Sequence, residues 1–268
     1  MRSFIFNIFF IAVTVLYAFV CVLLSLLPGR KVMMGSLRRY CRAIVWGMRH
    51  LAGIKLTVSG HEHIPAEGPV IIAAKHQSYG DGHAVFSQFF DLSFVAGDAI
   101  TKFIFIGRIL KKMNAVVIDN CGGSDARETM AETSKTVREQ GRRILIYPEG
   151  HLSKIGTQHR YRKGVYHLYK DFDCPVVPVA SNLGQRWNQE DWKKCPGPAA
   201  MEFLPPIMPG LDKEAFMAQL EEMIETRSIA LLDLENLGHL NPDDIGKTVE
   251  NDSARTKREA REAQESNT

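Results

Sequence analysis

The sequence has no C-x-x-C pair, and its five cysteines are an odd number scattered along the chain. This pattern excludes a disulfide framework and a zinc knuckle, and unpaired thiols suit a reducing compartment. The chain also has no G-x-S-x-G, G-x-G-x-x-G or H-E-x-x-H motif. A hydrolase nucleophile elbow, a dinucleotide-binding loop and a zinc-peptidase helix are therefore not indicated. We expect no metal and no resident cofactor.

Acidic residues are missing from the first 55 positions, which carry eight Lys and Arg residues. The net charge of the whole chain is only +3, so the remainder is mildly acidic. A basic N-terminal segment followed by a mildly acidic remainder favours binding to the surface of an anionic membrane over binding to nucleic acid. Nucleic acid is therefore not an expected partner.

Charge is also absent from residues 4–27, an apolar run of 24 residues. As a helix this run would be about 36 Å long, at roughly 1.5 Å per residue, which is enough to cross a bilayer core. A cleaved signal peptide is the alternative, but the run is long for one and no A-x-A site ends it. We expect a retained anchor. The positive charge that follows it predicts that the body faces the cytoplasm, and we expect the chain at the cytoplasmic (inner) membrane.

Residues 31–54 have the pattern of a basic amphipathic helix. Apolar side chains recur at steps of three and four, with arginines on the other side: Leu37, Cys41, Ile44, Met48 and Leu51 against Arg38, Arg39, Arg42 and Arg49. Such a stripe can lie in the lipid interface or pack on the protein's own core. Beside an anchor we favour the interface, so residues 1–54 are predicted to be a membrane-anchoring helix pair.

Short apolar strands alternate with helices in the rest of the chain. Strands are expected at 56–59, 69–74, 92–96, 115–119, 143–147, 175–180 and 200–204, and helices near 78–90, 101–112, 124–140, 163–171 and 212–233. This order predicts an α/β domain over residues 55–240, with a mixed, largely parallel sheet flanked by helices. Residues 241–268 are polar and are predicted to be a disordered tail.

Two groups of polar residues follow apolar strands directly. His76 comes after strand 69–74, and Asp81 follows five positions later, close enough to turn back onto the imidazole. Tyr147-Pro148-Glu149-Gly150 comes after strand 143–147. Carboxyl ends of parallel strands form ligand crevices, and a histidine oriented by a carboxylate can act as a general base. A His–Asp pair alone is more often a cap or a surface contact.

In their order along the chain, these groups resemble the glycerolipid acyltransferase family, whose best-known members are the 1-acylglycerol-3-phosphate acyltransferases. The resemblance covers about residues 56–210. It consists of His-x-x-x-x-Asp at His76 and Asp81, aromatic-Pro-Glu-Gly at Tyr147 to Gly150, and Val-Pro-Val at Val177 to Val179. It implies that His76 is the general base, Asp81 its partner, and Glu149 and Gly150 part of the acceptor side.

The departures from the family pattern concern cations. Members that use a phosphate-bearing acceptor usually have Arg where Asn120 stands, Arg where Leu152 stands after His151, and Lys where Gly97 stands. A phosphate in a partly dry pocket needs charge-assisted donors, each contributing about 1.5–3 kcal/mol. We therefore expect Gly97, Asn120, His151 and Leu152 to line a pocket for a phosphate-free acceptor.

The function that follows is O-acyl transfer from acyl-CoA or acyl carrier protein to the hydroxyl of a lysolipid. The preferred acceptor is a phosphate-free lyso-aminolipid, and lysophosphatidate is the alternative. Two other classes stay open: a membrane lipid-binding protein without catalysis, and a membrane-tethered hydrolase that releases free fatty acid. Membrane lipids and the acyl donor are the expected partners.

Overall fold

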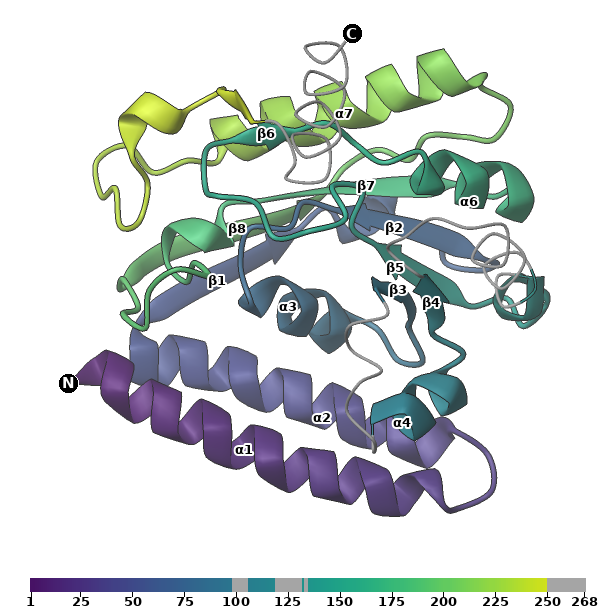
Figure 1. Ribbon diagram of the computed structural model, residues 1–268, viewed down its shortest axis with the longest axis horizontal. Coiled ribbons are helices and arrows are strands. Elements are labelled where there is room, and N and C mark those ends of the chain that lie inside the picture. Colours follow the sequence, from purple (N-terminus) through teal and green to yellow (C-terminus); the bar gives the residue numbers. More distant parts are fainter. Residues whose placement is uncertain (98–105, 119–131, 133–134, 250–268) are drawn as a thin grey trace, which may run out of the picture.

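A seven-stranded sheet crosses the centre of the computed structural model, which describes residues 1–97, 106–118, 132 and 135–249 (Figure 1). The strands are β1 (Ile54–Ser59), β2 (Val70–Ala74), β3 (Ser93–Gly97), β4 (Val116–Ile118), β5 (Arg143–Ile146), β7 (Val176–Ser181) and β8 (Gly197–Phe203), in the order β1-β8-β7-β2-β5-β3-β4. All neighbours are parallel except β7 and β8. The predicted mixed, largely parallel sheet is confirmed.

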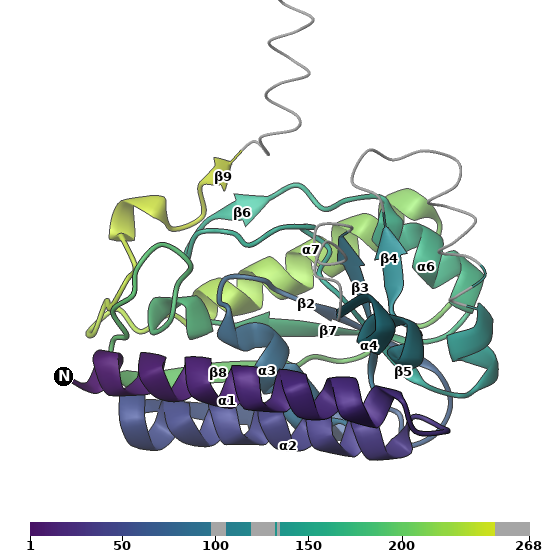
Figure 2. The same cartoon turned by 60° about the horizontal axis from the view of Figure 1, so that its bottom comes forward.

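Helices cover both faces of this sheet (Figure 2). On one face lie α1 (Arg2–Ser25), α2 (Lys31–Gly47) and α3 (Gly80–Gln88), and on the other lie α6 (Gly164–Phe172) and α7 (Lys213–Ala230). Every residue of β2 and of β7 is buried. This double cover explains why both strands are continuous apolar runs in the sequence rather than alternating ones.

The stripe of α2 packs inside the protein, which corrects the expectation that it faces lipid. Cys41, Ile44 and Met48 are at most 3 % exposed, and α2 contacts both α1 and α3. The helix ends in a π-helical turn, Met48–Ala52, that leads into β1. A stripe of this kind requires an apolar partner, and here α1 and α3 provide it.

The surface of α1 that faces away from α2 is the exposed apolar face of the pair. Phe4, Ile8, Val15, Leu16 and Phe19 are each more than half exposed. Among the described helices, α1 alone is long and apolar enough to cross a membrane, by length and composition. It nevertheless runs along α2 on the side of the domain (Figures 1 and 2).

Charged groups fasten the end of the α1–α2 pair to the domain. Lys112, on α4 (Ile106–Met113), donates hydrogen bonds to the carbonyls of Leu24 and Ser25 at 3.2 and 3.0 Å. A cation there also meets the negative end of the α1 dipole. Arg30, just before α2, pairs with Asp91 at 2.9 Å. The helix pair is therefore part of the folded body.

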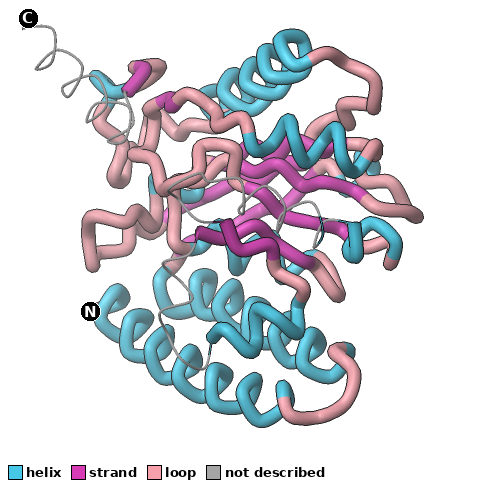
Figure 3. Tube along the Cα trace, turned by 45° about the vertical axis from the view of Figure 1, so that its right-hand side comes forward, coloured by secondary structure: helices cyan, strands magenta, loops and turns pink. Residues whose placement is uncertain are grey.

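Residues 241–249 are folded, which corrects the predicted start of the tail. They form a 3₁₀ turn, Pro242–Asp244, and strand β9 (Thr248–Val249), which pairs with β6 (Gln158–His159) (Figure 3). Asp244 also forms an ion pair with Lys154 at 2.8 Å. Backbone pairing with β6 orders this segment although its side chains are polar. Residues 250–268 lie outside the described part of the chain.

The other expected helices are confirmed within a few residues at their ends where the structure describes them. The helix near 101–112 is described from Ile106 onward. Of the helix expected at 124–140, residues 135–139 are helical, and most of the rest lies outside the described residues.

Candidate functional site

His76 and Asp81 meet at the carboxyl end of β2. His76 lies in the loop after the strand, and Asp81 lies in the first turn of α3. The Nδ1 atom of His76 is 3.3 Å from Oδ2 of Asp81, which also accepts hydrogen bonds from the backbone N–H groups of Gln77 and Ser78 at 2.7 Å each. The carboxylate is fully buried and the imidazole is 20 % exposed. A fixed, buried carboxylate thus orients a ring that solvent or substrate can reach.

The Tyr147–Gly150 turn lies beside this pair. The ring of Tyr147 stacks on His76, with centroids 3.8 Å apart and planes at 14°. Gly150 has φ of +73°, and a Cβ atom there would lie 2.5 Å from the Arg162 side chain. The left-handed backbone conformation therefore favours glycine, and a larger residue would also displace the Arg162 side chain. The turn brings the second sequence block next to the first, as predicted.

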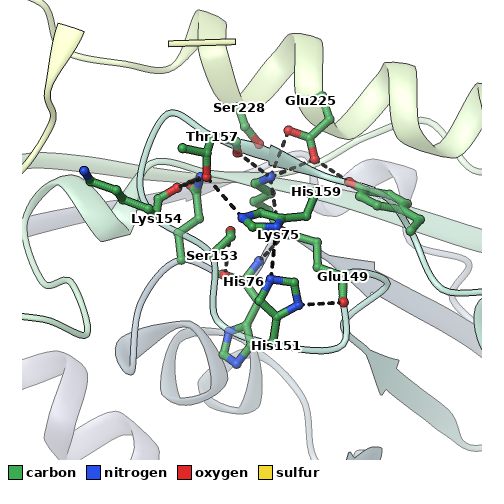
Figure 4. A network of polar contacts seen from close by, with 12 residues as sticks. Lys75, His76, Glu149, His151, Ser153, Lys154, Thr157, His159, Glu225 and Ser228 are labelled. Atoms are coloured by element: carbon green, nitrogen blue, oxygen red, sulfur yellow. Dashed lines mark hydrogen bonds and ion pairs between the residues drawn. The ribbon is translucent and has the colours of Figure 1, made fainter. Parts of the chain in front are cut away.

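The peptide of His76 is held on both sides. Its N–H donates to Oε1 of Glu149 at 3.1 Å. Its carbonyl accepts hydrogen bonds from the backbone N–H and the hydroxyl of Ser153 at 2.7 and 3.0 Å (Figure 4). Glu149 is fully buried, and its carboxylate points to this peptide and to Lys75 rather than lining a cavity described below.

Two cavities meet at His76. The first, here called the loop cavity, has a volume of about 420 Å³ and lies between the end of β3 and the segment 146–165. Its wall includes Gly97, Gly150, His151 and Arg162. The Nδ1 atom of His151 donates to the carbonyl of Glu149 at 2.9 Å, which fixes that ring on the wall.

The second cavity, here called the helix cavity, has a volume of about 460 Å³ and is lined mainly by α1, α2, α3 and α4. Both volumes fall in the range of ligand pockets, ~300–1,000 Å³. Three residues line both cavities: His76, Phe94 and Tyr147. The imidazole therefore stands at the junction of the two spaces.

The described wall of the helix cavity contains no Lys, Arg, Asp or Glu. Burial lowers the pKa of His83 to about 4 and raises that of Cys41 to about 12. Both groups are therefore uncharged at neutral pH. The Nε2 atom of His83 and the Tyr40 hydroxyl form a hydrogen bond of 3.0 Å. An uncharged, largely apolar space of this kind suits a hydrocarbon chain.

The structure divides the residues predicted for the acceptor pocket. Gly97, at the end of β3, lies on the loop cavity with Gly150 and His151, whereas Leu152 lies on the helix cavity. Asn120 lies outside the described residues. Arg162 is the one Lys or Arg among the described residues of the loop-cavity wall.

Two residues near His76 were missed by the sequence analysis, Lys75 and Glu225. Both are buried and they form an ion pair at 2.7 Å. One available signal for Lys75 was its position, since it is a charged residue between an apolar strand and His76. The signal for Glu225 was its position next to Ile224, on the buried side of α7.

Comparison with known proteins finds relatives that are acyltransferases. Residues 55–182 match the family model described as Acyltransferase. The chain is 31 % identical over 172 residues to a 1-acyl-sn-glycerol-3-phosphate acyltransferase of Pseudomonas aeruginosa, covering 64 % of this chain and 66 % of that protein. It is 23 % identical over 176 residues to the human 1-acyl-sn-glycerol-3-phosphate acyltransferase alpha, covering 62 % and 59 %. The matched stretch thus spans less than two thirds of each relative.

A solved structure agrees with the fold. The crystal structure of the 1-acyl-sn-glycerophosphate acyltransferase PlsC from Thermotoga maritima superposes with a TM-score of 0.70 at 18 % identity, over 86 % of this chain and 98 % of that one. The family-model match identifies residues 55–182, which contain the ordered His76–Asp81 and Tyr147–Gly150 blocks, as an acyltransferase domain, and the solved structure shows that the fold is shared.

Proposed function

We propose that the protein is a lysolipid O-acyltransferase that uses an acyl thioester, acyl-CoA or acyl carrier protein, as donor. The observation that carries this proposal is the position of His76 at the junction of an uncharged cavity and a second cavity whose wall includes Arg162 and His151. An acyl chain in the helix cavity would place its thioester beside the imidazole. An acceptor headgroup would then occupy the loop cavity.

The proposed reaction is one direct transfer. Nδ1 of His76 is engaged by Asp81, which leaves Nε2 to remove the proton from the acceptor hydroxyl. The hydroxyl oxygen attacks the thioester carbon, the carbon–sulfur bond breaks, and the imidazolium returns the proton to the thiolate. Asp81 stabilises the imidazolium and fixes its tautomer. The 3.3 Å separation is long for such a pair, and pairs of this kind tighten when substrate binds.

For the acceptor, we infer a phosphate-free lyso-aminolipid. Gly97 and Leu152 place no charge on the cavities, and Arg162 is the one Lys or Arg on the described loop-cavity wall. One guanidinium matches a single carboxylate, such as that of an amino-acid headgroup, better than a dianionic phosphate. Burying unpaired charge is costly, which disfavours the phosphate.

Lysophosphatidate is the second candidate acceptor. The names of the relatives support it, since each of those compared above is a 1-acyl-sn-glycerol-3-phosphate acyltransferase. Arg162 and His151 together would provide the cations in this case.

Product analysis tests the proposed reaction. Purified protein in lipid vesicles, given labelled palmitoyl-CoA and a mixture of lysolipids, is expected to form a labelled two-chain lipid at the rate at which free CoA appears. Free fatty acid formed at the same rate without acceptor would instead indicate a hydrolase. Lipid binding with no thioester consumption would indicate the non-catalytic alternative.

We further propose that the outer face of α1 holds the protein on the cytoplasmic side of the membrane. Leu16 and Phe19 on that face are 57 % and 63 % exposed. Removing two such side chains from lipid costs about 1.5–3 kcal/mol each. Leu16→Glu combined with Phe19→Glu is therefore expected to weaken binding to phosphatidylglycerol vesicles at least ~100-fold in a sedimentation assay, with an unchanged melting temperature.

Leu234→Glu is the matched control, because Leu234 is 63 % exposed but lies after α7. It should leave vesicle binding unchanged. Equal binding by the double variant and the unmodified protein would contradict the role of α1.

A further inference from the structure

Lys75, the residue before His76, is buried with its ammonium group among acceptors from three parts of the chain. The side chain is 1 % exposed. Its Nζ atom donates to both carboxylate oxygens of Glu225 at 2.7 and 2.9 Å and to the carbonyl of Thr157 at 3.1 Å. It also lies 3.3 Å from Oε2 of Glu149 (Figure 4). Its hydrogen bonds thus go to Glu225 and Thr157, and Glu149 is a third, ionic contact whose Oε2 atom has no hydrogen-bond partner among the described residues.

These contacts form a continuous chain from α7 to the peptide of His76. Glu225, on α7, holds Lys75, Lys75 faces one oxygen of Glu149, and the other oxygen of Glu149 accepts the N–H of His76 at 3.1 Å. Glu225 also accepts a hydrogen bond from the Tyr161 hydroxyl at 2.8 Å. A movement of the Glu225 carboxylate would therefore reach the histidine through two side chains.

Because its side chains are charged, this series of contacts depends on each of its residues. Two buried acidic side chains, Glu149 and Glu225, share the one ammonium group of Lys75. Burial raises the pKa of Glu225, Lys75 lowers it, and Glu149 raises it. Neutralising Glu225 would leave Lys75 with Glu149 as its sole anionic partner among these residues, and would draw the Glu149 carboxylate toward the ammonium group and away from His76.

Stability alone is a poor explanation for such a group. A buried ion pair often contributes no more to stability than well-packed apolar residues of the same volume. Glu225 also lies beyond residues 55–182, the stretch that matches the family model.

We propose that Lys75 and Glu225 are positioning residues for acyl transfer: Glu225 fixes Lys75, and Lys75 holds Glu149 against the N–H of His76. This inference rests on the proposed role of His76 as general base. Neither residue touches substrate, since neither lines the loop cavity or the helix cavity. A misplacement of a catalytic group by about 1 Å can lower turnover by ~10²-fold.

Glu225→Gln is the principal test, because it keeps the shape of the side chain and an acceptor for Tyr161 but removes the charge. Thioester consumption is followed with palmitoyl-CoA and the lysolipid that the unmodified protein uses. We expect kcat, corrected for the folded fraction, to fall by ~10–100-fold while KM for the acceptor changes less than threefold. Glu225→Asp keeps the charge and should retain more turnover than Glu225→Gln.

Arg227→Gln is the matched control on the same helix. Arg227 pairs with Glu202 of β8 at 2.7 Å, so the variant also removes an ion pair between α7 and the sheet, but one with no contact to the histidine loop. It should leave kcat unchanged. If Glu225→Gln and Arg227→Gln lower kcat equally, the loss reflects the attachment of α7, and the positioning role is wrong.

A double-variant cycle separates this inference from the proposed function. If Glu225 acts through His76, adding Glu225→Gln to His76→Ala should lower the residual rate no further. A further loss of tenfold or more in the double variant would overturn the positioning role. If His76→Ala itself keeps normal turnover, the proposed mechanism fails instead. Where Glu225→Gln folds incompletely, the rates of both Glu225→Gln variants are corrected for the folded fraction before they are compared.

Discussion

Replacing His76 with alanine is expected to lower kcat by at least ~10²-fold, the usual loss when a general base is removed. The variant should still fold, because the carboxylate of Asp81 keeps its two hydrogen bonds from the N–H groups of Gln77 and Ser78. The backbone contacts of residue 76 with Glu149 and Ser153 do not involve the imidazole either. Steady-state rates with palmitoyl-CoA and a lysolipid, together with melting temperatures, provide the measurement.

His83→Gln is the matched control for this experiment. His83 also lies on the wall of the helix cavity, but its low pKa of about 4 and its contact with Tyr40 give it no part in the proposed proton transfer. Glutamine can keep the contact with the Tyr40 hydroxyl, so turnover should stay within a few-fold. Near-normal transfer by pure His76→Ala would show that another group removes the proton.

Local sequence signals predict the centre of the site well because its parts are local or lie at strand ends. His76 and Asp81 are five positions apart, and Tyr147 follows a strand that pairs with β2. Parallel pairing of β2 and β5 brings both blocks to one edge of the sheet. The strand pattern therefore predicts both the fold and this juxtaposition.

Long-range packing explains what the sequence does not reveal. Glu225 and Lys75 are 150 residues apart, and only the docking of α7 on the sheet brings them together. The apolar stripe of α2 has the same sequence pattern whether lipid or protein covers it. Which of the two covers it depends on how α1 and α3 pack against the helix. Residues 241–249 are ordered by backbone pairing with β6, which side-chain polarity does not indicate.

The choice of acceptor is the other prediction with a large expected effect, and Gly97 offers the sharpest test. This residue ends β3 on the wall of the loop cavity, which it shares with Arg162 and His76. In a competition between lysophosphatidate and a lyso-aminolipid with an amino-acid headgroup, the unmodified protein should acylate the aminolipid faster. A phosphate there would meet one guanidinium on the described wall, and its second charge would be unpaired.

Gly97→Lys should shift that preference toward lysophosphatidate by ~10–100-fold, because one charge-assisted hydrogen bond contributes about 1.5–3 kcal/mol. Gly97→Met is the matched control, since it adds a long side chain without charge and should slow the acylation of both acceptors alike.

Arg162→Gln should raise KM for either acceptor if the guanidinium binds the headgroup. Faster consumption of lysophosphatidate by the unmodified protein would overturn the choice of acceptor, and the role of His76 in acyl transfer would be unaffected because it does not depend on the headgroup.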